Sequence, residues 1–139
     1  DGPLFGYIEN FRKKHLLEKK IILTGRLTHD VLCYYYNIST ALLHISLGAG
    51  VAGVIIEASA SGLPVIATTG AGSTHEYVNE RNQNGILINY GNNNELKNAI
   101  MTMLENDNSF RNFNTDFLNE FSYDAFGKQL STIYSELLE

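Results

Sequence analysis

The chain has 139 residues, 44% of them apolar, and a formal net charge of −5 at pH 7, which suits one compact domain with its own hydrophobic core. The acidic balance argues against a nucleic-acid-binding protein, and no apolar run approaches the ~20 residues of a membrane span. One cysteine excludes an internal disulfide and a cysteine-rich metal site, and it fits a reducing cytosol.

Helical and strand patterns alternate along the chain. Helices are predicted where apolar residues recur at helical spacing, and strands where short apolar runs end at turn residues. Ser73 and Glu76 form a Ser-x-x-Glu capping box, which marks the start of a short helix. In chain order the predicted elements are a helix over residues 4–17, a strand over 21–23, a helix capped by Thr28 that extends to Ile38, a strand over 41–46, a helix over 53–61, a strand over 65–68, the short helix after Ser73, a strand over 86–88, and helices over 94–105, 110–121 and 122–138, the last capped by Ser122.

The predicted strands are continuous apolar runs, which is typical of a parallel sheet buried on both faces. The expected fold class is therefore α/β: a Rossmann-like parallel sheet with helices on both faces, formed as a single domain over residues 1–139. Phosphate ligands of such sheets bind beyond the carboxyl ends of the strands, where helix N-termini point. Three loops are then expected to face the ligand: residues 25–28, 47–53 and 69–73.

Residues 48–53, Gly-Ala-Gly-Val-Ala-Gly, satisfy G-x-G-x-x-G between a predicted strand and a predicted helix. Glycines let the backbone approach a pyrophosphate, and the helix dipole favours the anion. A dinucleotide-binding domain for NAD or FAD is therefore one interpretation. It also requires an acid about 20 residues further on to hold the ribose, and the sequence around Thr68 has none. A tight turn without a ligand is the structural alternative.

Glu57 is the only Asp, Glu, Lys or Arg between Val31 and His75. It lies one helical turn after Gly53. Because helical side chains tilt back toward the N-terminus, its carboxylate leans toward the space that a bound phosphate would occupy. Its neighbours in sequence are apolar, and a buried carboxylate is costly unless it is paired. Hydrogen bonds from two sugar hydroxyls would satisfy it; the alternative is a glutamate on the solvent edge of the helix.

Several segments together resemble one family. The most specific is residues 57–68, Glu-Ala-Ser-Ala-Ser-Gly-Leu-Pro-Val-Ile-Ala-Thr, and it is supported by the turn at residues 1–3, the apolar run at 21–25, Asn-Gly-Ile-Leu at 84–87 and Phe-Ser-Tyr at 121–123. On these motifs the chain resembles, nearly from end to end, the C-terminal, donor-binding domain of a GT-B fold glycosyltransferase. The group it resembles is the large retaining family 4, the glycosyl transferases group 1.

The resemblance implies roles for individual residues. The family carries a pair of acids, E-x7-E. The second acid matches Glu57 and is implied to bind the ribose of a nucleotide sugar, whereas the first matches Ala49, so no catalytic residue is assigned in this chain. The other nucleotide-sugar-binding residues that it implies are Gly50, Val51, Ala52 and Gly53, through backbone donors to the diphosphate, and Arg26 and Leu27, around the base. No residue cluster has the spacing of a metal site.

For the intact enzyme the resemblance implies transfer of a sugar from a nucleotide-diphosphate sugar to a saccharide or lipid acceptor, as in polysaccharide biosynthesis, with retention and without a cofactor or required metal. The acceptor domain and the upstream strands are expected outside this chain, which alone would be incomplete and inactive. We expect a cytoplasmic enzyme, peripherally associated with the inner face of the cell membrane, with no nucleic-acid partner. Because Ala49 replaces an acid, a catalytically inactive glycosyltransferase-like binding module stays an alternative.

Overall fold

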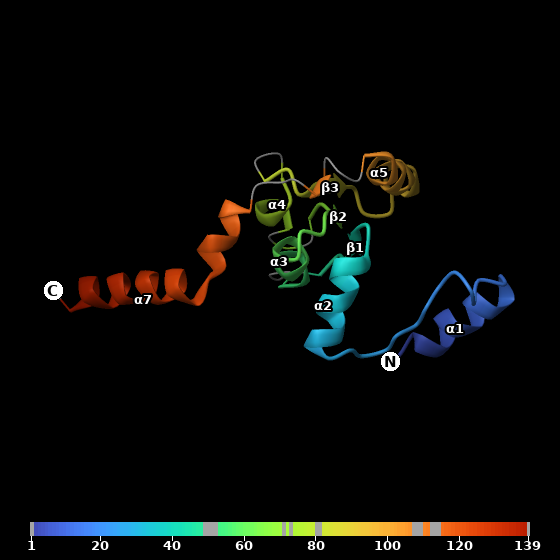
Figure 1. Cartoon of the computed structure of the whole chain (residues 1–139), viewed down its shortest axis with the longest axis horizontal. Helices are drawn as coiled ribbons and strands as arrows, with labels where there is room; N and C mark the ends of the chain where they lie inside the picture. Colours follow the sequence, from blue (N-terminus) through green and yellow to red (C-terminus); the bar gives the residue numbers. More distant parts are fainter. Residues whose placement is uncertain are drawn as a thin grey trace. The chain divides into compact units, whose positions relative to one another are not determined.

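The computed structural model describes residues 2–48, 53–70, 72, 74–79, 82–106, 110–111 and 115–138. Contacts within the chain separate it into two compact units, Asp1–Leu32 and Cys33–Glu139. Helix α2 (His29–Ile38) crosses the boundary between them. The first unit contains α1, and the second contains the sheet and the helices that cover it (Figure 1).

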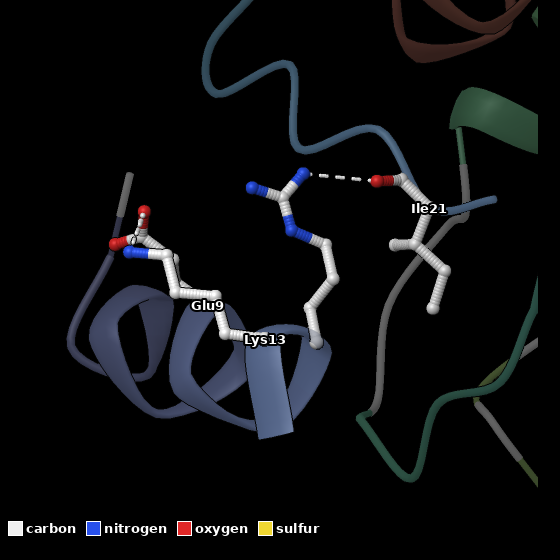
Figure 2. Close-up of polar contacts among 4 residues, drawn as sticks. Glu9, Lys13 and Ile21 are labelled. Carbon is white, nitrogen blue, oxygen red and sulfur yellow. Dashed lines mark hydrogen bonds and ion pairs between the residues drawn. The ribbon is translucent and has the colours of Figure 1, made fainter. Parts of the chain in front are cut away.

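The first unit is built on α1 (Phe5–Lys14), whose last turn carries three basic residues. Cations at this end offset the partial negative charge of the helix dipole. Lys13 also forms an ion pair with Glu9, one turn earlier, at 3.1 Å (Figure 2). Arg12 is half-buried and donates from Nη1 to the carbonyl oxygen of Ile21 at 2.9 Å, which ties the following coil to the helix.

The predicted strand over residues 21–23 is wrong. These residues are coil, and Ile22 is 73% exposed. The N–H of Ile21 bonds to the carbonyl of Leu17 at 2.9 Å in a turn, and its own carbonyl accepts from Arg12. A three-residue apolar run indicates a tendency to be buried. A strand also needs a partner strand, and the run by itself does not specify one.

The second unit is an α/β structure around a parallel sheet, as predicted. The strands pair in the order β1-β2-β3, and their parallel register brings the three carboxyl ends to one edge of the sheet. The strands are β1 (Leu42–His44), β2 (Val65–Thr68) and β3 (Gly85–Ile88). The helical elements described in this unit are α3 (Gly53–Ala60), α4 (Thr74–Tyr77), α5 (Asn93–Glu105), the 3-10 helix η1 (Asp116–Phe121) and α7 (Tyr123–Leu137).

Helices cover both faces of this sheet, which confirms the expected arrangement. Figure 1 shows the strands between α3 and α5. On one face Ile66 and Ile88 pack against Ala99 and Met103 of α5 in a buried cluster. Because side chains alternate between the faces of a strand, Val65 faces the other side, where α3 contacts β1 and β2. All four residues of β2 are buried, which explains why the first three are apolar.

The Asn-Gly pair that begins β3 is required by packing. A Cβ on Gly85 would lie 2.0 Å from the carbonyl oxygen of Val65, so only glycine lets β3 approach β2 this closely. The side chain of Asn84 is fully buried and donates to Ser59 Oγ at 3.1 Å and to the carbonyl of Tyr77 at 2.8 Å. This amide therefore ties α3 and α4 to the start of β3.

The C-terminal helices follow the prediction in part. Ser122 caps α7 by accepting a hydrogen bond from a backbone N–H in its first turn at 3.2 Å, as predicted. The predicted helix over 110–121 is wrong where η1 replaces it with 3-10 geometry. Phe121 packs its ring against those of Tyr77 at 5.1 Å and Phe117 at 6.5 Å. Apolar spacing alone does not separate a tight 3-10 turn from an α-helix of similar length.

Candidate functional site

The carboxyl ends of the three parallel strands define the candidate site. Residues 45–48 follow β1, residues 69–70 follow β2 and residues 89–92 follow β3. Ligands of open parallel sheets bind at this edge because the N-termini of the following helices point toward it. The described parts of two predicted loops, 47–53 and 69–73, lie there, which agrees with their expected position.

The entry to the glycine-rich loop is held by a buried hydroxyl. Thr68 is fully buried, and its Oγ1 donates to the carbonyl of Ser46 at 2.5 Å and accepts from the N–H of Ser46 at 3.0 Å. Ser46 Oγ in turn accepts from the N–H of Gly48 at 3.0 Å. Three consecutive hydrogen bonds therefore position the backbone as it leaves β1, and the glycine-rich segment starts from a fixed point.

Of the predicted diphosphate-binding residues, the structure describes only Gly53. Ala49, Gly50, Val51 and Ala52 lie outside the described residues, and their roles stay predictions. Gly53 is the first residue of α3, it is exposed, and a Cβ built on it would meet no atom within 4 Å. The first N–H groups of a helix have no intrahelical acceptor. Open space at this helix end therefore leaves room for an anion.

Glu57 lies in the second turn of α3 with its side chain half-buried. Tyr36 of α2 donates its hydroxyl to Oε2 of Glu57 at 3.0 Å. Tyr36 is only 4% exposed, so this donor is itself held by packing. Within the described part of the chain, Oε1 of Glu57 has no hydrogen-bond partner. The carboxylate is thus oriented by one bond and keeps acceptor capacity for another group.

The protonation state of Tyr36 follows from its surroundings. Burial raises the pKa of Tyr36 to about 12, and the hydrogen bond to Glu57 and the negative charge of that carboxylate add to the shift. Tyr36 is therefore a neutral donor throughout the physiological range. A protonated phenol beside an acceptor-only carboxylate is a charge-assisted hydrogen bond, which is stronger than one between two neutral groups.

The sequence did not reveal Tyr36. Residues 34–36 are three consecutive tyrosines, which span several faces of a helix, and their spacing singles out none of them as a functional residue. The structure places Tyr34 at 63% exposed, Tyr35 half-buried and Tyr36 buried against Glu57. The two partners are 21 residues apart, and no local spacing rule connects positions that far apart in sequence. Only the packing of α2 near α3 brings them together.

A second carboxylate lies at the same sheet edge, after β3. Glu95, in the first turn of α5, accepts from the backbone N–H of Asn89 at 2.6 Å, from Asn89 Nδ2 at 3.1 Å and from Asn92 Nδ2 at 2.7 Å. Asn92 caps α5 by accepting from the N–H of Glu95 at 3.2 Å. The backbone bond from Asn89, followed by its side-chain bond, lowers the pKa of Glu95. Asn-x-x-Glu before a helix is a capping-box pattern that we did not predict.

This second loop lines a cavity of about 210 Å³ between the ends of the strands and α5. Its walls come from residues 89–93 together with Ile45, Thr68, Ile88 and Leu96. Asn89 and Asn92 of the loop donate to Glu95 of α5, and Asn89 Oδ1 accepts from Thr69 Oγ1 at 3.2 Å. The hydrogen bonds of this loop therefore hold the end of β3 against the start of α5.

The two residues predicted to frame a base lie in the first unit. Arg26 is exposed and Leu27 is half-buried, in the loop that precedes α2. Gly25, just before them, has φ of +64°, a conformation that glycine adopts without strain. The part of Arg26 and Leu27 in nucleotide binding stays a prediction.

Within the described ranges, no group of three or more His, Cys, Asp or Glu side chains is arranged to hold a metal ion. No helix in the described part of the chain is long and apolar enough to cross a membrane.

The likeness to known proteins decides the family. The family described as Glycosyl transferases group 1 matches residues 1–116. The chain belongs to this family. It is 31% identical over 140 residues to an uncharacterized glycosyltransferase of Methanocaldococcus jannaschii, covering 99% of this chain and 39% of that protein. Among solved structures it is similar to sucrose-phosphate synthase from Thermosynechococcus elongatus, with a TM-score of 0.81 and 26% identity over 96% of this chain and 34% of that one.

These findings confirm the predicted family and fold. The chain is a glycosyl transferases group 1 domain whose sheet and helices align with part of a GT-B glycosyltransferase. It spans 39% of the length of the curated relative and 34% of the solved one. The family match includes the segment from Glu57 to Thr68, on which the predicted resemblance mainly rested.

Proposed function

We propose that this chain binds the nucleotide-sugar donor of a glycosyltransferase. The observation that carries the proposal is the state of Glu57: a half-buried carboxylate in α3 that is oriented by Tyr36 and has one oxygen without a partner among the described residues. A carboxylate in such a position is stabilised by further donors. The vicinal hydroxyls of a ribose supply two, and Glu57 would anchor them.

The remaining parts of the site fit the same donor. The N-terminus of α3 and the backbone N–H groups of residues 50–53 would receive the diphosphate, because helix N-termini favour anions. The hydrogen bonds between Thr68 and Ser46 fix where this loop begins. Preorganised donors of this kind stabilise the charge that develops on a leaving diphosphate. Arg26 and Leu27 would frame the base.

In the intact enzyme the donor sugar would pass to a saccharide or lipid acceptor with retention of configuration, in polysaccharide biosynthesis at the cytoplasmic face of the cell membrane. The family resemblance supports these finer features. An acceptor domain supplied from outside residues 1–139 would complete the active site. The chain by itself would bind the donor without transferring its sugar, and no cofactor takes part in the proposal.

The test is a calorimetric titration of the complete chain with UDP, GDP and NADH. We expect binding of one of the two nucleoside diphosphates and none of NADH. Tight binding of NADH with no response to either diphosphate would instead support the dinucleotide interpretation and overturn the proposal. This arm needs no mutation, so it does not depend on the stability of a variant.

Glu57→Gln tests the residue that carries the proposal. Glutamine keeps the size of the side chain but removes its charge and one acceptor oxygen, so we expect the affinity for the bound nucleotide to fall about tenfold. Glu105→Gln, at the exposed C-terminal end of α5, is the matched control and should bind as the wild type does. An unchanged affinity in Glu57→Gln would remove the ribose contact.

A catalytically inactive binding module is the second candidate, and Ala49 favours it. The position carries a methyl group where the family has its first acid, so this side chain offers no carboxylate to the donor sugar. Measurable sugar transfer by the protein that carries this domain would reject the inactive alternative. Donor binding without transfer, in the presence of a range of saccharide acceptors, would support it.

A further inference from the structure

We propose that Tyr36 is a positioning residue that, through Glu57, makes the site discriminate a ribonucleotide from a 2′-deoxyribonucleotide. The inference rests on the proposed role of Glu57 and adds a second residue to it. Tyr36 belongs to α2 and Glu57 to α3, and the hydroxyl of the first donates to Oε2 of the second at 3.0 Å. Tyr36 would not touch the nucleotide itself.

The burial of Tyr36 makes it suited to this role. Tyr36 is 4% exposed, so packing fixes both torsions of its side chain and the position of its hydroxyl oxygen. A phenol has one proton to donate, and here it goes to Oε2. The hydrogen bond therefore fixes the rotation of the carboxylate, and Oε1 keeps a defined direction instead of sampling several.

A fixed carboxylate discriminates better than a mobile one. An acceptor aimed at both hydroxyls of a ribose loses a hydrogen bond when the 2′-hydroxyl is missing, and a site built to bond a hydroxyl rejects the analogue that lacks it. A carboxylate that rotates freely can re-aim at the remaining hydroxyl or at water. The rejection is then weaker, although binding of the nucleotide itself continues.

A purely structural role for Tyr36 makes a different prediction. If the phenol only satisfied a half-buried carboxylate, its loss would change the binding of ribo- and deoxyribonucleotides equally. Discrimination, expressed as the ratio of the two dissociation constants, separates the two roles. Tyr34 lies in the same helix but is 63% exposed, so Tyr34→Phe removes a hydroxyl from α2 without touching Glu57 and is the matched control.

The experiment measures the dissociation constants of the preferred nucleoside diphosphate and its 2′-deoxy form for the complete chain. We expect the wild type and Tyr34→Phe to prefer the ribonucleotide about tenfold. Tyr36→Phe should reduce this preference to about threefold. Glu57→Gln should nearly abolish it, and the double variant should match Glu57→Gln, because Tyr36 acts only through that carboxylate.

The outcomes separate this inference from the proposed function. A wild-type preference in Tyr36→Phe, together with its loss in Glu57→Gln, would overturn the role of Tyr36 and leave that of Glu57 intact. No preference in the wild type, or no binding of the ribonucleotide or its 2′-deoxy form, would overturn the roles of Tyr36 and of Glu57. If Tyr36→Phe does not fold, 4-aminophenylalanine at position 36 retains an N–H donor; it should keep the preference, and loss of preference in a folded chain of this kind would also contradict the inference.

Discussion

Two carboxylates lie near the N-termini of helices that follow strands of the same sheet, and their surroundings differ. Glu95 of α5 accepts three hydrogen bonds from Asn89 and Asn92, within six residues of its own position. Glu57 of α3 accepts one, from Tyr36, which is 21 residues away. Both oxygens of Glu95 are engaged by its own loop, whereas one oxygen of Glu57 has no partner within the described ranges.

We interpret this difference as the one between a structural acid, Glu95, and the proposed binding acid, Glu57. A carboxylate whose acceptor sites are filled by nearby backbone and amide groups stabilises its loop and has little left for a ligand. A carboxylate that is oriented by one buried donor but only partly satisfied is prepared for donors from outside. A charged residue at the edge of a sheet therefore needs its hydrogen bonds counted before a function is assigned to it.

The largest expected effect comes from disturbing the packing of β3 against β2, in the sheet whose edge carries both acids. Gly85→Ala places a Cβ 2.0 Å from the carbonyl of Val65, so β3 must move away from β2. We expect a loss of about 3 kcal/mol in the free energy of unfolding, the upper part of the range for overpacking. Urea denaturation measures it. Gly127→Ala in α7, where a Cβ meets no atom within 4 Å, is the control and should be at least as stable as the wild type. An unchanged midpoint for Gly85→Ala would contradict the close approach of the strands.

The next effect tests the donor to Glu57 through pH. The pKa of Tyr36 is raised from 10.0 to about 12. The unfolded chain therefore loses this proton first, and the stabilisation is complete below pH 10 and is lost as the pH rises from 10 to 12. The contribution of this group should fall by at most about 1.4 kcal/mol per pH unit in that interval.

Tyr36→Phe isolates that contribution from the titration of the other tyrosines and lysines. The difference in unfolding free energy between wild type and variant, measured by urea denaturation at pH 8 to 12, should be constant up to pH 10 and then decline. Tyr34→Phe should differ from the wild type by the same amount at every pH. A wild-type minus Tyr36→Phe difference that does not change above pH 10 would show that burial and Glu57 do not raise the pKa of this phenol in the folded chain.

The smallest expected effect mirrors the Glu57→Gln test. Glu95→Gln weakens the bonds from Asn89 and Asn92 to the carboxylate, so we expect Tm to fall by a few degrees with nucleotide affinity unchanged. Because the pKa of Glu95 is lowered from 4.5, its contribution should be present above that value and disappear as the pH falls through the lowered pKa. Thermal unfolding measures the Tm at each pH, and a nucleotide titration of the same preparation measures the affinity. Equal loss of affinity in Glu95→Gln and Glu57→Gln would remove the distinction between the two acids.

Local pattern was sufficient for much of the fold. The apolar run at Val65–Thr68 is a fully buried strand, and Ser122 caps the helix that it was predicted to begin. Both signals are contained within a few residues. Predictions failed where the outcome depended on a distant partner: the run at 21–23 has no strand beside it and is coil, with the carbonyl of Ile21 bonded to Arg12.

The candidate site also combines features that local sequence predicts with features that depend on distant partners. The sequence by itself determined that Glu57 is an isolated acid one turn into a helix that follows a glycine-rich turn, and its motif identified the family. Only the tertiary structure decided that Tyr36 is the donor to that acid and that Gly85 must lack a side chain beside Val65. The physical reason is that periodicity and capping act over one or two turns, whereas these contacts join residues about 20 positions apart, which only the packing of helices and strands brings within hydrogen-bond or van der Waals distance.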